Sequence, residues 1–205
     1  MKRIQRLRPG DSVTPRILRA VSSESLSIPD SSHLIHLQFR RFAGCPICKL
    51  HLRSFAQRHN ELLEAGIREM AVFHSSAESI LRHDGHLPFP VIADPDKHLY
   101  NEFGLEKSIR SILDPRTWSM IVRGLAIFGP GPPEKGESGL GLPGDFLISP
   151  DMRIVACKYG VHADDHWSVD EVLQLSKLAA AAPGQHATEL IAQYPETLTY
   201  GKISK

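Results

Sequence analysis

Residues 33–63 read HLIHLQFRRFAGCPICKLHLRSFAQRHNELL, and this stretch decides the fold of the chain. Residues 34–39 form an apolar run that predicts a buried strand. Cys45 and Cys48 follow after a short basic turn that contains a glycine. From Lys49 onward the apolar residues recur at helical spacing, which is typical of an amphipathic helix. We therefore expect both thiols at the point where a strand passes into a helix.

This position favours reactive sulfur. The N-terminus of a helix offers free backbone N–H groups and the positive end of the helix dipole, and both stabilise a thiolate. Cys45 is nearest to the helix start and is expected to be the more exposed thiol. The positive charges of Arg40, Arg41 and Lys49 flank the pair and are expected to favour the thiolate further. Together with Pro46, these charges predict that the pair lies outside the core.

Two alternatives to redox chemistry stay open for the cysteine pair. A zinc site would need further ligands, but Cys157 stands alone, and His51 and His59 share the predicted helix with the thiols. The other alternative is a pair of inert cysteines in the core. A Cys-x-x-Cys pair beside a strand and a helix is most typical of a redox pair in a reducing compartment. We therefore predict thiol chemistry with no metal and no bound cofactor.

The frame Phe39, Cys45, Cys48 and Leu52, followed by an amphipathic helix, resembles the peroxiredoxin (AhpC/TSA) branch of the thioredoxin superfamily. Among its members, the chain is most similar to peroxiredoxin-like proteins that retain a Cys-x-x-Cys. The resemblance implies an α/β, thioredoxin-like fold, in which helices flank a central mixed sheet, with an N-terminal β-hairpin and a helical insert. It also implies a redox-active disulfide between the two cysteines.

A second similarity to peroxiredoxins lies about 40 residues downstream of the cysteines. Phe89 and Pro90 are followed by three residues and Asp94, and a predicted helix then ends at Phe103 and Gly104. Peroxiredoxins carry a Phe-Pro-x-x-x-Asp strand and a helix ending in Tyr/Phe-Gly at this place. The two similarities together make the resemblance more specific than the thiol motif alone.

The peroxidase motif Pro-x-x-x-Thr-x-x-Cys is incomplete in either register. With the peroxidatic position on Cys48, Arg41 replaces the proline and Cys45 replaces the threonine. With that position on Cys45, Gln38 and Phe42 stand there instead. Thioredoxins point to the first cysteine as the nucleophile and peroxiredoxins to the second, so the attacking sulfur stays open. The missing threonine predicts slow peroxidase turnover with intact disulfide exchange.

Pro143 is a further supporting residue implied by the resemblance. Peroxiredoxins place an arginine that polarises the peroxide before the strand that matches residues 146–148, and Pro143 stands in its place. Thioredoxin-like oxidoreductases instead hold a cis-proline before this strand, facing the thiols, and Pro143 resembles it. An ordinary trans proline in a loop is the alternative.

The remaining pattern predicts the other elements of the fold. Spacing and turn residues predict short strands within residues 13–28 and parallel strands at 34–39 and 67–73. They also predict a helix from residue 77 capped by Ser76, a short edge strand and a turn within 87–96, and a helix at 97–103. A hairpin at 145–157 and a helix from residue 169, capped by Ser168, complete the prediction. The two thiols would lie where the strands end and the helices begin.

One domain with an insert and a tail is predicted: residues 1–182 form the thioredoxin-like domain, with the insert at about 106–144, and residues 183–205 form a C-terminal extension. Residues 108–128 predict two helical pieces with more apolar surface than a peripheral loop needs. They either cover the site, bind an apolar substrate, form a dimer contact or pack on their own core, and the last is favoured. Residues 129–144 are loop by composition.

Composition bounds the function. The chain has 205 residues, with 24 Lys plus Arg against 23 Asp plus Glu, so we expect no nucleic-acid partner. No run reaches the roughly 18 apolar residues of a membrane span. The charged N-terminus lacks an apolar segment behind it, and three cysteines do not form an even disulfide framework. These features predict a cytoplasmic protein without a membrane partner.

The leading hypothesis is a thiol-dependent oxidoreductase that reduces peroxides or disulfides through Cys45 and Cys48 and is recycled by a thioredoxin-like or glutathione-like thiol reductant. A homodimer is a further option. The alternative function is a non-catalytic binding or regulatory module that uses the apolar insert as its interaction face. Reduction of a lipid-like endoperoxide is a third possibility, suggested by related proteins. Cys157 is predicted to be a small core residue, and residues 162–166 are predicted to be a loop rather than a metal site.

Overall fold

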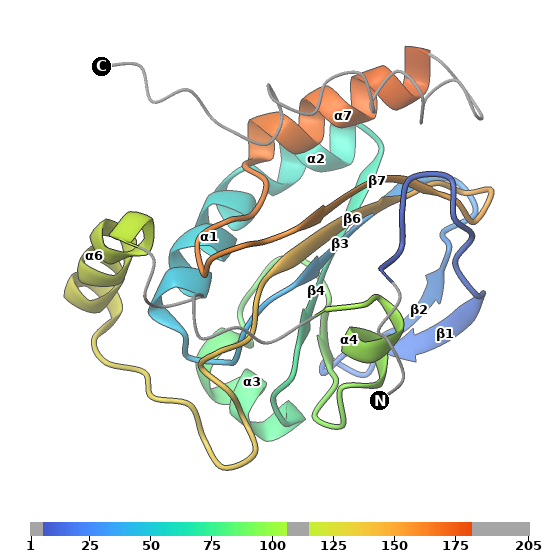
Figure 1. Cartoon of the computed structure of the whole chain (residues 1–205). Coiled ribbons are helices and arrows are strands. Elements are labelled where there is room, and N and C mark those ends of the chain that lie inside the picture. The colour runs from blue at the N-terminus through green and yellow to red at the C-terminus, as the bar shows by residue number, and fades with distance from the viewer. Residues whose placement is uncertain (1–5, 106–114, 182–205) are drawn as a thin grey trace, which may run out of the picture.

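A five-stranded mixed sheet forms the centre of the computed structural model, which describes residues 6–105 and 115–181 (Figure 1). Its strand order is β5-β4-β3-β6-β7. The pairs β3/β4 and β4/β5 are parallel, whereas β3/β6 and β6/β7 are antiparallel. The strand bounds are β3 Leu34–Phe39, β4 Ile67–Phe73, β5 Val91–Ala93, β6 Gly144–Ile148 and β7 Ile154–Tyr159.

Helices and a separate hairpin cover the two faces of this sheet. The first face carries α1, α2, α3 and α7, and the opposite face carries α4 and the antiparallel hairpin β1–β2 (Figure 1). The helix bounds are α1 Pro46–Gln57, α2 His59–Glu64, α3 Ala77–Asp84, α4 His98–Glu102, α6 Trp118–Phe128 and α7 Val169–Ala181, and the hairpin strands are β1 Arg16–Arg19 and β2 Ser25–Ile28. A short 3-10 turn, Pro115–Thr117, leads into α6.

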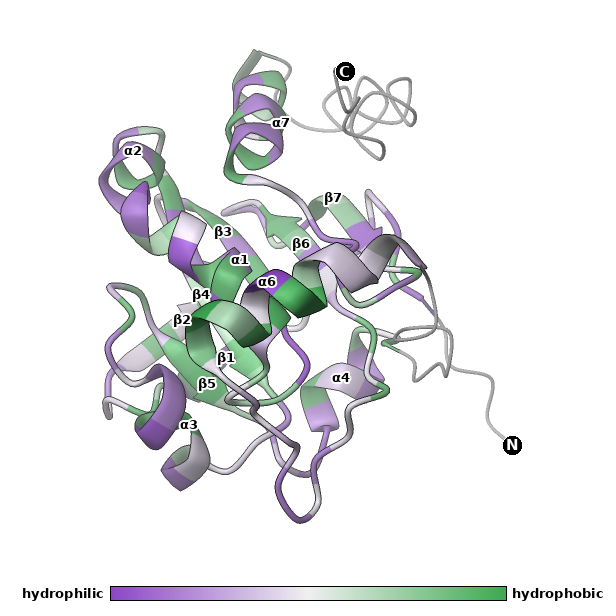
Figure 2. Ribbon diagram, turned by 90° about the vertical axis from the view of Figure 1, so that its left-hand side faces the viewer, coloured by the Kyte–Doolittle hydropathy of each residue, from purple (hydrophilic) through white to green (hydrophobic). Residues whose placement is uncertain are grey.

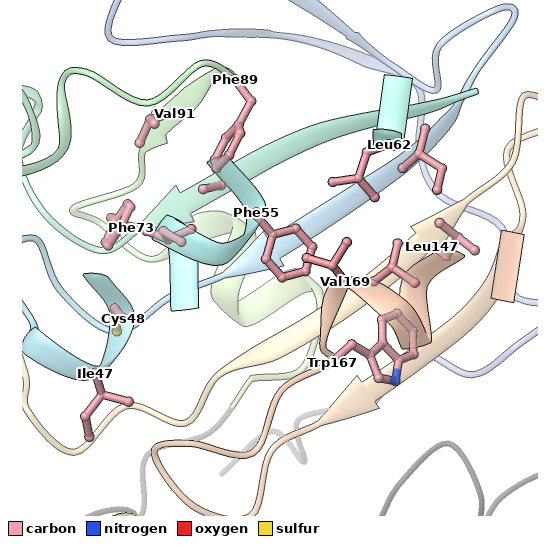
Figure 3. Packing of buried hydrophobic residues seen from close by; sticks show 14 of the residues in the cluster. Ile47, Cys48, Phe55, Leu62, Phe73, Phe89, Val91, Leu147, Trp167 and Val169 are labelled. Carbon is pink, nitrogen blue, oxygen red and sulfur yellow. The ribbon is translucent and has the colours of Figure 1, made fainter. Parts of the chain in front are cut away.

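The alternation of side chains along β3 divides the core into two layers. Ile35, Leu37 and Phe39 enter the layer beneath the hairpin and α4. His36 and Gln38 point to the other face, although both are fully buried. The apolar layer on that face contains Phe55, Leu62, Leu147 and Trp167 (Figure 3). A strand that looks apolar as a whole thus places polar groups beneath the thiol helix.

Most of the predicted elements are confirmed. The α/β thioredoxin-like architecture, the N-terminal hairpin and the parallel pair β3/β4 are all present. The Ser76 side chain caps α3 by accepting from the Ser79 N–H, and Ser168 and Glu171 form a capping box at the start of α7. The first helical piece of the insert and the C-terminal extension lie outside the described residues, so these predictions and the domain division remain untested.

The described part of the insert is α6 together with a long irregular segment, residues 129–142, which we call the strap. Figure 2 shows α6 lying across α1, and Met120 and Ile121 pack against the core. Trp118, Val122 and Leu125 remain exposed, so α6 does not bury all of its apolar surface in a core of its own. None of the helices within the described residues has the length and apolar character needed to cross a bilayer.

Candidate active site

Cys45 and Cys48 lie at the start of α1, as the sequence predicts. Cys45 is the N-cap residue, with extended backbone angles, and Pro46 occupies the first turn, where its missing N–H leaves no helical hydrogen bond unmade. Gly44, directly before the pair, has φ of +81°, a conformation that favours glycine. The turn between β3 and α1 thus delivers the Cys45 sulfur to the free N–H groups of the first helical turn.

Burial of the thiols is the main departure from the sequence prediction. Cys45 is 1% exposed and Cys48 is 4% exposed, so the expectation of an exposed pair with Cys45 outermost is wrong. Cys48 is enclosed within the layer of the core that contains Ile47, Phe55 and Phe73 (Figure 3). α6 and the strap, which lie far from the cysteines in sequence, pack against the helix start and the turn before it. Local charge and Pro46 therefore could not reveal this packing.

The two thiols differ in their tendency to ionise. Burial opposes ionisation of Cys45, but a hydrogen bond from Cys48, the charge of Arg41 and the backbone N–H groups of Cys48 and Ile47 outweigh it and lower the pKa of Cys45 to about 7. Burial and the neighbouring Cys45 sulfur raise the pKa of Cys48 well above its usual value. At neutral pH Cys45 is therefore partly ionised, whereas Cys48 keeps its proton.

Arg40 and Arg41 do not act together on the sulfur as predicted. The Arg41 Nη1 donates to Cys45 Sγ over 3.8 Å, and its Nη2 donates to the Gly139 carbonyl of the strap. Arg40 is fully buried and points away, with its Nη2 only 2.6 Å from Asp145 Oδ1. Consecutive side chains of an extended segment leave on opposite sides, so only Arg41 reaches the thiols.

Beneath α1 lies a buried charge band, which we define as His36, Gln38, Arg40, Glu69 and Asp145. The strand register places His36 opposite Glu69 and Gln38 opposite Asp145. The His36 ring bridges the two carboxylates, with Nδ1 at 2.6 Å from Glu69 Oε1 and Nε2 at 3.4 Å from Asp145 Oδ1. Gln38 donates to Glu69 and accepts from Arg40. The charges alternate across three strands, which offsets the cost of burying each one.

The protonation states in this band follow from its charges. Burial alone would lower the pKa of His36, but the charges of Glu69 and Asp145 and hydrogen bonds to both raise it to about 9, so the ring is cationic at neutral pH. Burial alone would raise the pKa of Asp145, but the charge of Arg40 and hydrogen bonding to His36 outweigh it and hold this pKa well below its usual range. The band therefore holds two cations against two carboxylates.

His51 connects the charge band to the thiol helix. Arg40 Nη2 donates to His51 Nε2 at 2.8 Å, and the His51 ring lies 3.6 Å, centroid to centroid, from the ring of His166. Burial and the charge of Arg40 lower the pKa of His51 well below its usual value, so the ring is neutral and accepts this bond. His51 follows Cys48 by one turn of α1, and the bond therefore fixes the helix at the level of the thiols.

Three polar side chains that the sequence analysis did not single out hold the backbone around the thiols. Ser75 Oγ accepts from the Ala43 N–H at 2.8 Å, and Asp84 Oδ2 accepts from the Gly44 N–H at 3.3 Å. The Tyr100 hydroxyl donates to the Arg40 carbonyl. Ser75 is the second residue after β4, and the ends of neighbouring parallel strands meet at one edge, so its position was a usable signal. Asp84 and Tyr100 carried no comparable signal.

The Leu142–Pro143 peptide is trans, so the predicted cis-proline is wrong. Within residues 6–105 and 115–181 the cis peptide is Ile28–Pro29. The Pro143 carbonyl accepts from the Gly160 N–H at 3.0 Å and thereby closes the end of the β6/β7 hairpin. A Cβ added at Gly160 would meet the Pro143 ring at 2.7 Å. Pro143 thus serves the join between β6 and the segment after β7.

Cys157 and residues 162–166 have structural surroundings. Cys157 is partly buried rather than deep in the core, its Sγ donates to the Leu7 carbonyl at 3.5 Å, and burial raises its pKa to about 12. Asp165 pairs with Lys158 at 2.9 Å. Among the described residues no group of three or more His, Cys, Asp or Glu side chains is arranged to hold a metal ion.

The fold and the thiol pair define the class of protein: a thioredoxin-like fold with a Cys-x-x-Cys at the start of the first central helix. The model of the AhpC/TSA antioxidant enzyme family matches residues 54–162, more than half of the chain. The chain belongs to this family, and it is a thiol-dependent oxidoreductase. The matched residues begin after Cys48, so the match is independent of the thiol motif. No curated protein matches the sequence significantly.

Solved structures of peroxiredoxins share the fold. A cysteine-to-serine mutant of PrxQ from Xylella fastidiosa superposes with a TM-score of 0.62 at 19% identity, covering 87% of this chain and 99% of that one. Peroxidoxin BcpB from Mycobacterium tuberculosis gives 0.61 at 14% identity, covering 83% and 97%. The reduced 2-Cys peroxiredoxin of Plasmodium vivax gives 0.61 at 11% identity, covering 85% and 83%. At these identities the likeness establishes the fold.

Proposed function

We propose that this chain reduces hydroperoxides with Cys45 as the attacking thiolate and Cys48 as the resolving thiol. The observation that carries the proposal is the asymmetry of the pair. Cys45 has a pKa of about 7 and accepts hydrogen bonds at the helix start, whereas the pKa of Cys48 is raised. A nucleophile that is partly ionised at neutral pH attacks, and a thiol that keeps its proton is suited to the second step.

The chemistry then runs in two steps. The Cys45 thiolate attacks the terminal oxygen of the hydroperoxide, a sulfur–oxygen bond forms, the oxygen–oxygen bond breaks, and the departing alkoxide takes a proton from solvent. Cys48 then attacks the sulfenic acid on Cys45, and its thiol proton leaves with the hydroxyl group as water. An external thiol reductant supplies two electrons and two protons to reopen the disulfide. No metal or bound cofactor enters either step.

Arg41 is the charged group that supports this chemistry. Its guanidinium donates to Cys45 Sγ and lowers the pKa of that thiol. In the Cys45 register Phe42 replaces the threonine of the peroxidase motif, and Pro143 stands where peroxiredoxins place the arginine before the later strand. We therefore expect peroxide turnover that is slower than in enzymes with the complete motif. The buried position of both sulfurs favours small hydroperoxides over protein disulfides.

The surroundings of the reaction are also proposals. An odd number of cysteines, three, suits a reducing compartment, so we place the reaction in the cytoplasm with a thioredoxin-like or glutathione-like thiol as the reductant. A homodimer stays a prediction of the sequence, and sedimentation velocity of the purified chain distinguishes it from a monomer.

Trapping of the oxidised intermediate tests the proposal. After one equivalent of hydrogen peroxide and a sulfenic-acid probe, the Cys48→Ser variant should carry the probe on Cys45, and Cys45→Ser should carry none. A probe on Cys48 in the Cys45→Ser variant would reverse the assignment. Consumption of hydroperoxide and reduction of insulin disulfides are then measured side by side. Activity that neither substitution changes in either assay would contradict a catalytic role for the pair.

A further inference from the structure

The two thiols lie beneath a lid, which we define as α6 together with the strap. Cys45 is 1% exposed and Cys48 is 4% exposed, and Met120 and Ile121 of α6 pack against the core cluster that contains both. In Figure 1, α6 stands at the end of α1 that carries the cysteines. A reactant must therefore be small or must displace the lid before it reaches the sulfur.

The contact between α6 and the thiol helix depends on a glycine. Gly124 is the buried residue of α6, and a Cβ at this position would meet the Pro46 carbonyl carbon and Cβ at 2.9 Å. Contacts this short are not tolerated by real Cβ atoms, and Pro46 cannot move without moving the helix start. The backbone of α6 thus packs directly against Pro46, the first of the two residues between the cysteines, and leaves no space for a side chain at Gly124.

A second glycine, Gly131, allows the strap to pack equally closely against the turn before Cys45. A Cβ at Gly131 would overlap the carbonyl oxygen of Gly44, the residue directly before Cys45. The strap is also held by side chains of the main domain. Arg41 donates to the Gly139 carbonyl, and His74 Nε2 accepts from the Ser138 N–H at 3.0 Å. Arg41 therefore contacts both the reactive sulfur and its cover.

We propose that the lid sets the substrate specificity of the site, with Gly124 and Gly131 as the specificity-determining residues. The close glycine contacts hold the lid against the turn and helix start that carry Cys45, so we expect hydrogen peroxide and small alkyl hydroperoxides to reach the sulfur more readily than bulky hydroperoxides and protein disulfides. The part of this inference that concerns hydroperoxides rests on the proposed function. The enclosure of Cys45 does not rest on the proposed function, because it concerns how easily any reactant reaches the sulfur.

Alkylation of Cys45 tests the enclosure without catalysis. The rate with iodoacetamide is compared with the rate with a polyethylene glycol maleimide, Cys45 being followed by peptide mass spectrometry and glutathione serving as the unshielded standard. For each thiol, the rate with the bulky reagent is divided by the rate with the small reagent. In the unaltered protein this rate ratio for Cys45 should be at least about tenfold lower than the ratio for glutathione, which corresponds to about 1.4 kcal/mol. A ratio equal to that of glutathione would overturn the inference.

Substitution of the two glycines tests their role. Gly124→Ala and Gly131→Ala should each push the lid away from α1 and raise the rate ratio of Cys45 at least about fivefold toward that of glutathione. Lys135 is an exposed residue of the strap, and Lys135→Ala should leave the rate ratio unchanged. Melting curves identify any variant that fails to fold. If one glycine variant fails to fold, the rate ratio of the other variant still tests the lid. If both folded variants keep the ratio of the unaltered protein, the glycines do not set access.

Turnover separates this inference from the proposed function. Hydroperoxide consumption is measured with hydrogen peroxide and with cumene hydroperoxide, and both Gly→Ala variants should shift the preference toward the bulky substrate. An unaltered protein that consumes neither hydroperoxide would refute the proposed function while the alkylation ratios still decide the enclosure. Equal preference in the variants and the unaltered protein, with measurable activity, would refute the role of the lid in specificity.

Discussion

Arg40 and Arg41 are neighbours in the chain, yet their side chains enter two different buried regions. Arg41 reaches the thiol site, where its partners are one sulfur and one carbonyl of the strap. Arg40 enters the charge band, where its Nη2 contacts Asp145, Gln38 and His51. Both guanidinium groups are buried, so the difference lies in how their charge is compensated.

The charge band is closed by the sheet itself. Its members come from β3, β4, β6 and the residue after β3, and their register is set by strand pairing. The thiol site is closed instead by α6 and the strap. Strand pairing is hard to open locally, whereas a surface segment held by a few contacts opens at lower free energy. One region is therefore suited to fix α1, and the other to admit a reactant.

Breaking the charge band should have the largest effect on stability. Asp145→Leu leaves Arg40 and His36 without their shared carboxylate, and we expect the free energy of unfolding to fall by about 3–5 kcal/mol. The combined variant Arg40→Met with Asp145→Leu removes both charges, and its loss should be well below the sum of the two single losses. Denaturant unfolding measures all three. Additive losses would show that the two charges do not stabilise each other.

Removing Arg41 should act on chemistry more than on stability. Arg41→Met takes away the charge beside Cys45 and should raise the pKa of that thiol by about 1 unit or more. The pH profile of Cys45 alkylation measures this. Lys49→Met is the matched control, because Lys49 flanks the pair in sequence and is not among the main causes of the lowered pKa of Cys45. A pKa that stays near 7 in Arg41→Met would contradict the role of this charge.

The sequence predicted the fold well because its signals are local. The apolar spacing of α1, the caps Ser76 and Ser168 and the turns around the hairpins are read within a few residues. The placement of the thiols at the start of α1 also follows from a local sequence signal. Alternation along the end of β3 would also have separated Arg40 from Arg41, so this part of the site was within reach.

The closure of the two buried regions was not predictable in the same way. His36 and Gln38 appear inside an apolar run, and the carboxylates that compensate the charges there, Glu69 and Asp145, stand on other strands. The segments packed against the thiol turn begin at residue 118, where Gly124 stands inside a predicted helix and Gly131 looks like ordinary loop composition. Contacts between residues this far apart in sequence follow from the fold, and spacing alone does not reveal them.

The pH dependence of stability should separate the two regions. The pKa of His36 is raised from 6.5 to about 9, so its contribution is fully present below pH 6.5 and is lost as the pH rises through 9. The pKa of Cys45 is lowered from 9.0 to about 7, so its contribution is present above pH 9 and is lost as the pH falls through 7. Between pH 7 and pH 9 the two contributions change in opposite directions.

The variant Cys45→Ser isolates the contribution of the band. Its free energy of unfolding should decline more steeply from pH 7 to pH 9 than that of the unaltered protein, because the thiolate no longer offsets the loss at His36. Adding Glu69→Gln should flatten the decline, since His36 then lacks the carboxylate whose charge contributes most to raising its pKa. Parallel curves for Cys45→Ser and the unaltered protein would mean that folding does not lower the pKa of Cys45.

The smallest expected effect compares two neighbouring serines. Ser75 Oγ accepts from the Ala43 N–H beside the thiols, and Ser76 Oγ accepts from the Ser79 N–H at the start of α3. Each replacement by alanine removes one hydrogen bond to a backbone N–H and should lower the free energy of unfolding by about 1 kcal/mol. Only Ser75→Ala should also change the alkylation rate of Cys45, because Ala43 lies in the turn that holds the sulfur at the helix start. Equal alkylation rates in the two variants, with equal losses of stability, would show that the thiol turn is held by the sheet and α1 without Ser75.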